Sequence, residues 1–309
     1  MRPAARLSEG FPRTIPRVTP PARRSADRAG SWAVAVDRGG TWVRVLAASR
    51  AGEERAARRP ASRVPDLERP LARLLRRWRI APDEIGALVV ASRGVWTAAE
   101  RRAAEHGLRG LARRIRAISD VEAAYRGALG EGAGVLLLAG TGSIALGRDV
   151  RGGWRRAGGL GPLLGDEGSA FWIGRQWLRA TAGEASRPRL RRLLGAPDAV
   201  RRIAALAPAV LRRARGGDSQ ARHVVAEAQR ELARLLHEAA RRARLRPPVR
   251  VSWAGRLMDD AAFRAGVWRA ARRQGLRIAP RPPAAAPVRA ALGLAIAALA
   301  PTTRTPRGP

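Results

Sequence analysis

The sequence contains no cysteine, and this absence excludes several kinds of site at once. Without thiols the protein has no disulfide bond, no thiolate zinc centre, no iron–sulfur cluster and no cysteine nucleophile. Since nothing in the chain depends on an oxidising compartment, we expect a cytoplasmic location.

Lysine and asparagine are also missing, so all 60 lysine-or-arginine positions are arginine, and the formal net charge is +35. A basic chain suggests nucleic-acid binding, which would weaken steeply with salt. The arginines are spread over every segment, as at Arg76–Arg77 and Arg241–Arg242, whereas a binding module gathers them on one element. A bias towards residues with GC-rich codons explains the composition equally well. We therefore expect no nucleic-acid partner, although the charge favours anionic substrates such as ATP.

Long apolar runs are absent too. Stretches such as Gly134–Ile144 are short and interrupted by Gly and Thr, and none approaches the roughly 20 residues that cross a bilayer. The 309 residues are 46% hydrophobic, which is enough for a large core in two lobes. Residues 1–30 are rich in Arg and Pro and lack the apolar region of a secretory signal, so we expect a disordered leader, and residues 301–309 a loose tail.

The chain repeats one pattern. Trp32–Val36 and Trp42–Ala48 are apolar runs joined by a Gly turn, and Gly134–Gly147 repeats this arrangement. Strand and helix patterns alternate after each hairpin. We predict an α/β protein with an N-terminal lobe at residues 31–130 and a C-terminal lobe at 131–287, facing each other over a cleft. The closing helix, residues 288–300, is a candidate to pack on the N-terminal lobe.

The remaining elements follow from periodicity and capping residues. We expect strands at Ile85–Ala91, Ile115–Ile118, Val249–Trp253 and Leu276–Ile278. We expect helices at Leu67–Arg79, Ala98–Arg113, Val121–Leu129, from Ser169, through Pro188–Arg246 with a break at Gly216-Gly217, at Asp260–Gln274 and at Val288–Leu299.

The two hairpin turns carry the first candidate chemistry. They contain Asp37, Gly39, Gly40 and Thr41 in the first half and Gly140, Thr141 and Gly142 in the second. Glycines let backbone N–H groups approach phosphate oxygens, and a strand-end Asp is suited to Mg²⁺ that retains part of its water shell. Either turn alone is also compatible with an ordinary hairpin. Two such turns from opposed lobes predict a grip on one polyphosphate.

A carboxylate lies between these turns. Asp120 follows the predicted strand Ile115–Ile118, where it could accept the proton of an attacking hydroxyl. The alternative is a helix N-cap for the segment that follows, a position that Asp favours.

Two further segments suit a ligand. Gly158–Ser169 is rich in Gly, contains two acids and leads directly into a helix, which indicates a closely approached anion or hydroxyl group. Its alternative is a structural loop with a capping Asp. Ser252–Arg256 runs from a strand into Gly and a helix, so it is either the floor of a nucleotide pocket or a routine strand–helix junction.

The order of these motifs resembles the BadF/BadG/BcrA/BcrD ATPase family, specifically its N-acetylglucosamine kinase branch within the actin-like ATPase superfamily. The resemblance spans Trp32 to Leu299, and its most specific part is Gly158–Gly174. It implies a duplicated ribonuclease-H-like fold with two lobes around a nucleotide cleft. It also implies an ATP-dependent sugar kinase that uses ATP and Mg²⁺, with an amino-sugar, first N-acetylglucosamine, as acceptor.

The resemblance also assigns roles. Asp37 would be the magnesium-associated carboxylate of a first phosphate loop, and Asp120 the general base. The first phosphate loop would also contain Gly39, Gly40 and Thr41, and the second phosphate loop would consist of Gly140, Thr141 and Gly142. The adenosine site would contain Ala254 and Gly255. The sugar site would contain Asp120, Gly161, Pro162 and Asp166.

Three departures from the family pattern lie on the acceptor side. Glu53–Glu68 lacks the usual Asn, Ala91–Gly94 reads Ala-Ser-Arg-Gly instead of Gly-x-Ala/Ser-Gly, and Leu160 replaces a frequent Trp. Several acceptors besides N-acetylglucosamine therefore stay open, namely N-acetylmuramic acid, glucosamine, glucose or a non-sugar. A regulatory protein that binds ATP or an amino-sugar without turnover is also compatible with the motifs, and a homodimer is an open option.

Overall fold

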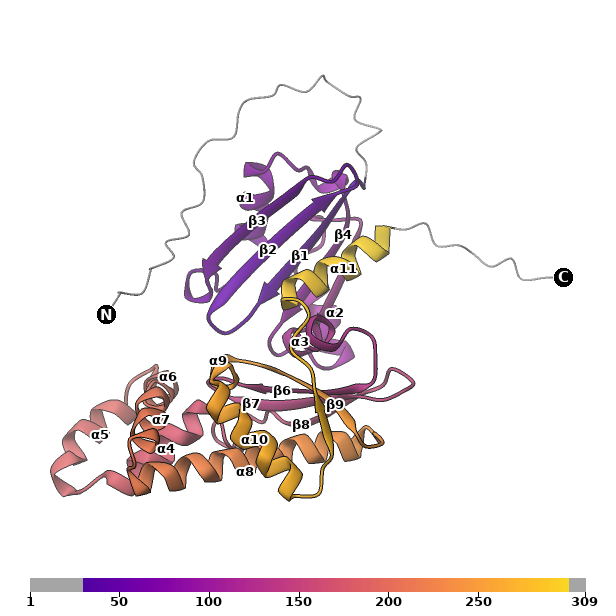
Figure 1. Cartoon of the computed structure of the whole chain (residues 1–309). Helices are drawn as coiled ribbons and strands as arrows, with labels where there is room; N and C mark the ends of the chain where they lie inside the picture. Colours follow the sequence, from indigo (N-terminus) through magenta and orange to yellow (C-terminus); the bar gives the residue numbers. More distant parts are fainter. Residues whose placement is uncertain (1–29, 300–309) are drawn as a thin grey trace, which may run out of the picture.

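The computed structural model describes residues 30–299 and contains two β-sheets in separate halves of the molecule (Figure 1). The strands are β1 Trp32–Arg38, β2 Trp42–Ser49, β3 Glu54–Pro60, β4 Ile85–Ser92, β5 Arg114–Ser119, β6 Gly134–Ala139, β7 Ser143–Arg148, β8 Trp154–Gly158, β9 Val249–Ala254 and β10 Ile278–Pro280. The helices are α1 Glu68–Arg77, α2 Ala98–His106, α3 Asp120–Leu129, α4 Ala170–Thr181, α5 Arg187–Leu194, α6 Ala199–Ala204, α7 Ala207–Arg215, α8 Ser219–Arg242, α9 Arg256–Asp259, α10 Ala261–Arg273 and α11 Pro287–Leu299.

The first sheet has the order β3-β2-β1-β4-β5. Strand β1 is antiparallel to β2 and parallel to β4, which is parallel to β5. Both faces are buried: Val34 and Val36 pack with Leu71 of α1, while the opposite face of β1 packs against α11. Burial on both faces explains why β1 and β4 are continuous apolar runs.

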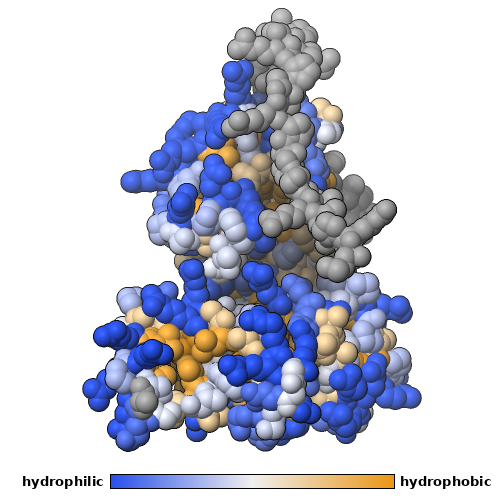
Figure 2. Space-filling model, turned by 60° about the vertical axis from the view of Figure 1, so that its left-hand side comes forward, coloured by the Kyte–Doolittle hydropathy of each residue, from blue (hydrophilic) through white to orange (hydrophobic). Residues whose placement is uncertain are grey.

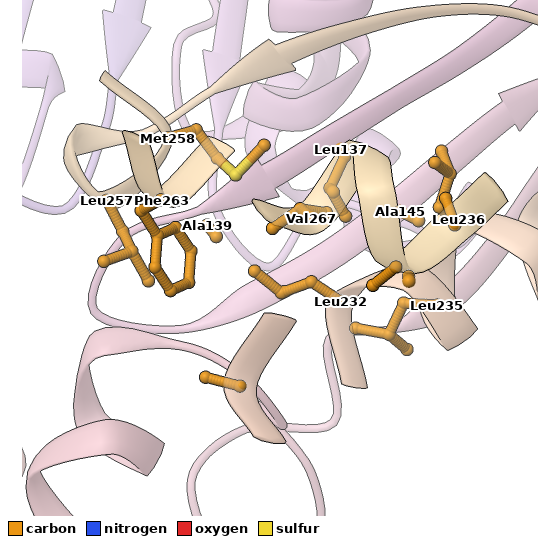
Figure 3. Close-up of a cluster of buried hydrophobic side chains, with 14 of the residues drawn as sticks. Leu137, Ala139, Ala145, Leu232, Leu235, Leu236, Leu257, Met258, Phe263 and Val267 are labelled. Atoms are coloured by element: carbon orange, nitrogen blue, oxygen red, sulfur yellow. The ribbon is translucent and has the colours of Figure 1, made fainter. Parts of the chain in front are cut away.

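The second sheet repeats this arrangement in the order β10-β9-β6-β7-β8, with an antiparallel hairpin β6–β7 and β6 parallel to β9. One face carries the largest hydrophobic cluster of the described chain, formed with α8 and α10. Leu137 and Ala139 of β6 belong to the same cluster as Leu232 of α8 and Phe263 and Val267 of α10 (Figure 3). The two similar sheets confirm the duplicated two-lobe α/β fold.

Helices α3 and α11 link the two halves (Figure 1). Tyr125 and Leu129 of α3 pack on Leu136 and Leu146 of the second sheet, and the Tyr125 hydroxyl donates a hydrogen bond to the Gly132 carbonyl at 2.7 Å. The closing helix α11 returns to the first sheet, where Leu292 is buried against β1 and β4. The junction between β5 and α3 therefore lies between the first sheet with α11 and the second sheet.

Several sequence expectations need correction. Strands β3 and β8 were not expected, because both are Arg-rich and without hydrophobic alternation, and β3 is also largely exposed. Helix α2 ends at His106, and the following residues to Leu111 form turns instead of continuing to Arg113. The expected helix over Pro188–Arg246 is divided into α5 to α8, with breaks in addition to the one at Gly216-Gly217.

The surface is polar on both halves. Figure 2 shows hydrophilic residues over much of both halves of the face in view, with apolar residues among them, most clearly in the lower half. Within residues 30–299, no helix is both long and apolar enough to cross a membrane. The predicted leader and tail lie outside the described residues, apart from Gly30.

Leu232→Ala tests the packing of the second lobe. Leu232 is fully buried between α8, α10 and the sheet, so its truncation leaves a cavity and lowers the free energy of unfolding by about 2–5 kcal/mol. Chemical denaturation monitored by tryptophan fluorescence measures the change. Leu194→Ala is the matched control, because Leu194 is 63% exposed and its loss changes stability by about 0.5 kcal/mol at most. Equal effects of the two substitutions would contradict the described core.

Candidate active site

The carboxyl ends of three parallel strands form the first part of the site. In the sheet register, Arg38 lies beside Ser92, and Ser92 lies beside Ser119. Asp37, near the end of β1, therefore lies at the carboxyl-terminal ends of these strands together with Arg93 and Asp120, which directly follow β4 and β5. This is the edge at which open α/β sheets bind ligands.

Asp37 is a buried carboxylate. Its side chain is close to the end of β1 and only 4% of the residue is exposed. Burial raises the pKa of Asp37, and the Arg44 guanidinium, 3.1 Å from Oδ2, opposes that rise. The carboxylate is thus held in place by a cation from the next strand.

The first turn, Gly39–Thr41, closes tightly. The Gly39 N–H donates to the Trp42 carbonyl at 3.0 Å, and the Thr41 carbonyl accepts from the Ala61 N–H at 2.9 Å. Gly40 and Thr41 are exposed. The turn is fixed through its ends, and its tip is accessible to a ligand.

Asp120 is the first residue of α3, and the N-cap of this helix is Ser119. The alternative that Asp120 caps the helix is therefore wrong. Asp120 Oδ1 accepts from the Val121 N–H at 2.9 Å. Burial is the main cause that raises the pKa of Asp120, and the Asp37 charge raises it further. The hydrogen bond from the Val121 N–H and the Arg93 charge both lower this pKa, but burial outweighs them. A carboxyl group with a raised pKa is suited to proton transfer.

The second turn is clamped by Asp166. The Ser143 N–H donates to Asp166 Oδ1 at 3.0 Å, and Asp166 is 8% exposed. Burial raises the pKa of Asp166, which the Ser143 N–H counteracts. A Cβ on Gly142 would lie 2.7 Å from Oδ1, so only glycine fits beside this carboxylate. Asp166 itself has a φ of +61°, a strained conformation that concentrates at functional sites.

Helix α4 secures the same turn from its carbonyl side. The Ala170 N–H donates to the Gly140 carbonyl at 2.9 Å, and the Phe171 N–H donates to the Thr141 carbonyl at 3.2 Å. The cap of α4 is Ser169, whose hydroxyl accepts from the Trp172 N–H, so the alternative in which an Asp caps this helix is wrong. The first two N–H groups of the helix are thereby committed to the turn.

Ala254 and Gly255 lie beside this second turn. Ala254 is paired with Leu138 at the end of β6, and Gly255 follows with a φ of +92°. A Cβ on Gly255 would lie 2.3 Å from the Ala139 carbonyl oxygen, a contact that no larger residue permits. The backbone of β9 therefore passes directly against the start of the Gly140 turn.

Gly161 and Pro162 occupy a more open part of the loop. No atom lies within 4 Å of a Cβ built on Gly161, and the adjoining Leu163 and Leu164 are 92% and 79% exposed. The structure thus separates Asp166, which faces the second turn, from the exposed tip of its own loop. Within residues 30–299, no hydrogen bond or ion pair joins the Asp37–Asp120 set to the Gly140–Asp166 set.

Sequence reasoning missed three contributors. Ser143 supplies the N–H that Asp166 binds, and its hydroxyl donates to the Glu167 carbonyl at 2.7 Å. Ser169 caps α4, which its place before an apolar helical run could have indicated. Arg93 follows β4 and lies near both acids, and the sequence signals for it were its strand-end position and its departure from the family motif in Ala91–Gly94.

Comparisons with known proteins agree with this arrangement. A protein of Chromobacterium violaceum assigned provisionally as an N-acetylglucosamine kinase superposes with a TM-score of 0.64 at 24% identity, over 86% of this chain and 99% of that one. A protein of Porphyromonas gingivalis with the same provisional assignment gives 0.62 at 18% identity, over 84% and 97%. At these identities the likeness establishes the fold alone, with its two similar sheets.

A curated relative adds a sequence match. The N-acetylmuramic acid/N-acetylglucosamine kinase of Clostridium acetobutylicum is 32% identical over 100 residues, which are 32% of this chain. The match spans about a third (33%) of that relative's length. Residues 31–294, nearly all of the described chain, match the sequence profile of one family. The protein belongs to the BadF/BadG/BcrA/BcrD ATPase family.

Proposed function

We propose that this protein is an ATP-dependent sugar kinase that phosphorylates an amino-sugar, with N-acetylglucosamine as the first candidate. The observation that carries the proposal is the presence of two glycine turns, one on each sheet, together with a half-buried carboxyl group, Asp120, that directly follows β5. Membership in an ATPase family and likeness to proteins named as amino-sugar kinases support it.

The glycine turns are suited to the phosphates of ATP. Gly39, Gly40 and Thr41 offer an accessible turn tip on the first sheet, and Gly140, Thr141 and Gly142 offer a second turn whose carbonyls are already bonded to α4. Ala254 and Gly255, which lie against the second turn, would border the adenosine. Backbone N–H groups and glycines of this kind approach phosphate oxygens closely.

The residues also fit Mg²⁺. Asp37 is a buried carboxylate at the first turn, and within residues 30–299 no cluster of three or more His, Cys, Asp or Glu residues forms a complete metal cage. Mg²⁺ commonly binds through one or two carboxylates together with water and phosphate oxygens. Asp37 would hold the ion, which neutralises phosphate charge when bound.

Asp120 is the proposed general base. Its raised pKa means that the Asp120 carboxylate binds a proton more tightly, as a general base must. Asp120 is also close to Asp37 and therefore to the first glycine turn, which is the proposed phosphate loop. Asp120 would accept the proton of an acceptor hydroxyl while the second oxygen of the carboxylate orients that hydroxyl. Asp166, Gly161 and Pro162 would bind the sugar, and closure of the lobes would exclude water.

The altered segment Ala91–Gly94 favours a second candidate, a regulatory protein that binds ATP or sugar without turnover. Arg93 places a large cation where relatives of the resembled branch carry a small residue. A kinase that acts on N-acetylmuramic acid, glucosamine or glucose is also compatible with the site. The cytoplasmic location and a homodimer stay predictions.

Acceptor-stimulated ADP release tests the proposal. We expect turnover of Mg²⁺–ATP with N-acetylglucosamine in a panel that also contains N-acetylmuramic acid, glucosamine and glucose. Asp120→Asn should lower kcat by about 10²- to 10⁴-fold, because the variant cannot accept the proton. Asp83→Asn, at an exposed site on the first lobe, is the control and should keep full activity. Full activity of Asp120→Asn would exclude the assigned base, and ATP binding without turnover would favour the regulatory protein.

The same variant should change stability with pH. Because burial raises the pKa of Asp120, the favourable contribution of its protonated form is complete below the ordinary value of 3.8 and is lost as the pH rises through the raised value. Asp120→Asn should therefore unfold at higher denaturant concentration than the parent protein at neutral pH, and the difference should vanish in acid. A variant that is less stable at neutral pH would contradict a desolvated carboxylate.

Asp166 has two functions that can be separated by substitution. Asp166→Asn keeps an oxygen for the Ser143 N–H and tolerates the positive φ, so only the charge towards the sugar is lost. We expect its acceptor KM to rise about tenfold with an unchanged Kd for ATP. Asp166→Ala also releases the second turn and should weaken ATP binding as well. An effect of Asp166→Asn on ATP alone would assign Asp166 to the phosphate side.

A further inference from the structure

Arg93 lies at the centre of the first half of the site. It follows β4, the strand between β1 and β5, and comes one residue after the register position where Arg38, Ser92 and Ser119 are neighbours. Its neighbours along the sheet edge are therefore the first glycine turn on one side and Asp120 on the other. Among the described residues, Arg93 is the arginine that follows the strand lying between the first glycine turn and Asp120.

The Arg93 guanidinium lies along the first turn. A Cβ added to Gly40 would be 3.2 Å from Nη1 of Arg93, 3.6 Å from Cζ and 4.0 Å from Nε. The absence of a side chain at Gly40 is therefore what allows the guanidinium to approach the turn. Its donors are presented beside the accessible turn tip.

The guanidinium has no protein partner within residues 30–299: no hydrogen bond or ion pair involves its nitrogens. Asp37 is already engaged by Arg44 at 3.1 Å, and Asp120 accepts its hydrogen bond from the Val121 N–H. Arg93 acts on Asp120 only through its charge, which lowers the pKa of that carboxyl against the stronger effect of burial. Five N–H donors are thus available at the turn.

The charges of the site need such a cation. Asp37 and Asp120 are close enough for the Asp37 charge to affect Asp120, and the Asp120 carboxylate would repel the terminal phosphate of a bound nucleotide. Arg44 neutralises Asp37 alone. A planar guanidinium is well matched to phosphoryl oxygens, because it can donate two parallel hydrogen bonds.

We propose that Arg93 binds the γ-phosphoryl group of ATP and stabilises the charge that develops on it during transfer. This inference rests on the proposed function, because it takes the Gly39–Thr41 turn as a phosphate loop. In the transfer the acceptor oxygen forms a bond to phosphorus, its proton moves to Asp120, and the bond between the γ-phosphorus and the β-phosphate bridging oxygen breaks to release ADP. Arg93 exchanges no atom and supplies positive charge.

The competing assignment is recognition of an anionic acceptor. A guanidinium between the turn and Asp120 could instead bind the carboxylate of an acidic sugar. The position beside Gly40 favours the phosphate, because the contact is with the turn and not with the Gly158–Ser169 loop proposed for the sugar. The two assignments predict different kinetic and binding effects.

The test compares the affinities for ATP and ADP by titration calorimetry with Mg²⁺ and without acceptor. For Arg93→Ala we expect Kd for ATP to rise about tenfold while Kd for ADP is unchanged, since only ATP carries the γ-phosphate. Arg93→Lys should recover part of the ATP preference. Arg69→Ala removes an exposed arginine of α1 from the same lobe and should change neither affinity.

Turnover provides a second readout. Arg93→Ala should lose kcat at least about tenfold with little change in acceptor KM, and added guanidinium ion should restore part of it. Equal losses for ATP and ADP, or an unchanged ATP affinity, would overturn the inference. A raised KM confined to acidic acceptors, with unchanged kcat, would also overturn it and assign Arg93 to the acceptor. If the parent protein binds no ATP at all, the proposed function itself fails.

Discussion

The site depends on the parallel register of β1, β4 and β5. Because these strands end at the same edge, Asp37, Arg93 and Asp120 lie side by side although they are far apart in the sequence. Asp37 is buried and Asp120 is half-buried, and the Asp37 charge adds to the rise in the pKa of Asp120, so the protonated form of Asp120 is favoured. The packing of α3 and α11 holds the strands that lead to these residues. Because the negative charges of Asp37 and Asp120 lie close together, the carboxyl-terminal ends of these strands favour a bound cation. The same proximity favours proton binding by Asp120.

In the second sheet a different set of contacts holds the glycine turn. There a single carboxylate, Asp166, takes the Ser143 N–H, while the first two residues of α4 bind the carbonyls of Gly140 and Thr141. The turn is therefore shaped before any ligand arrives, which lowers the ordering cost of binding. The first turn, in contrast, is fixed only at its ends, so the two halves of the duplicated fold prepare their turns differently.

Much of this arrangement was predictable from the sequence, and the exceptions have physical causes. β1, β4 and β6 are buried on both faces and are recognisable as apolar runs, and Gly142 of the second turn is required by its close contact with Asp166. β3 and β8 are edge strands that are rich in Arg and lack hydrophobic alternation, so no periodicity marks them. The partners of Asp120 and Asp166 were not predictable, because Ser119 and Ser169 could each have exchanged the capping role with the neighbouring acid. The sequence marked Arg93 only as a departure from the family pattern in Ala91–Gly94, and its place beside Gly40 became evident only in the structure.

The most direct test of the account is a crystal structure with Mg²⁺, a non-hydrolysable ATP analogue and N-acetylglucosamine. The account predicts that the β- and γ-phosphates lie between Gly39–Thr41 and Gly140–Gly142, with one sugar hydroxyl about 2.6–3.2 Å from the Asp120 carboxylate. A nucleotide bound away from either turn, or a sugar whose hydroxyls all point away from Asp120, would contradict it.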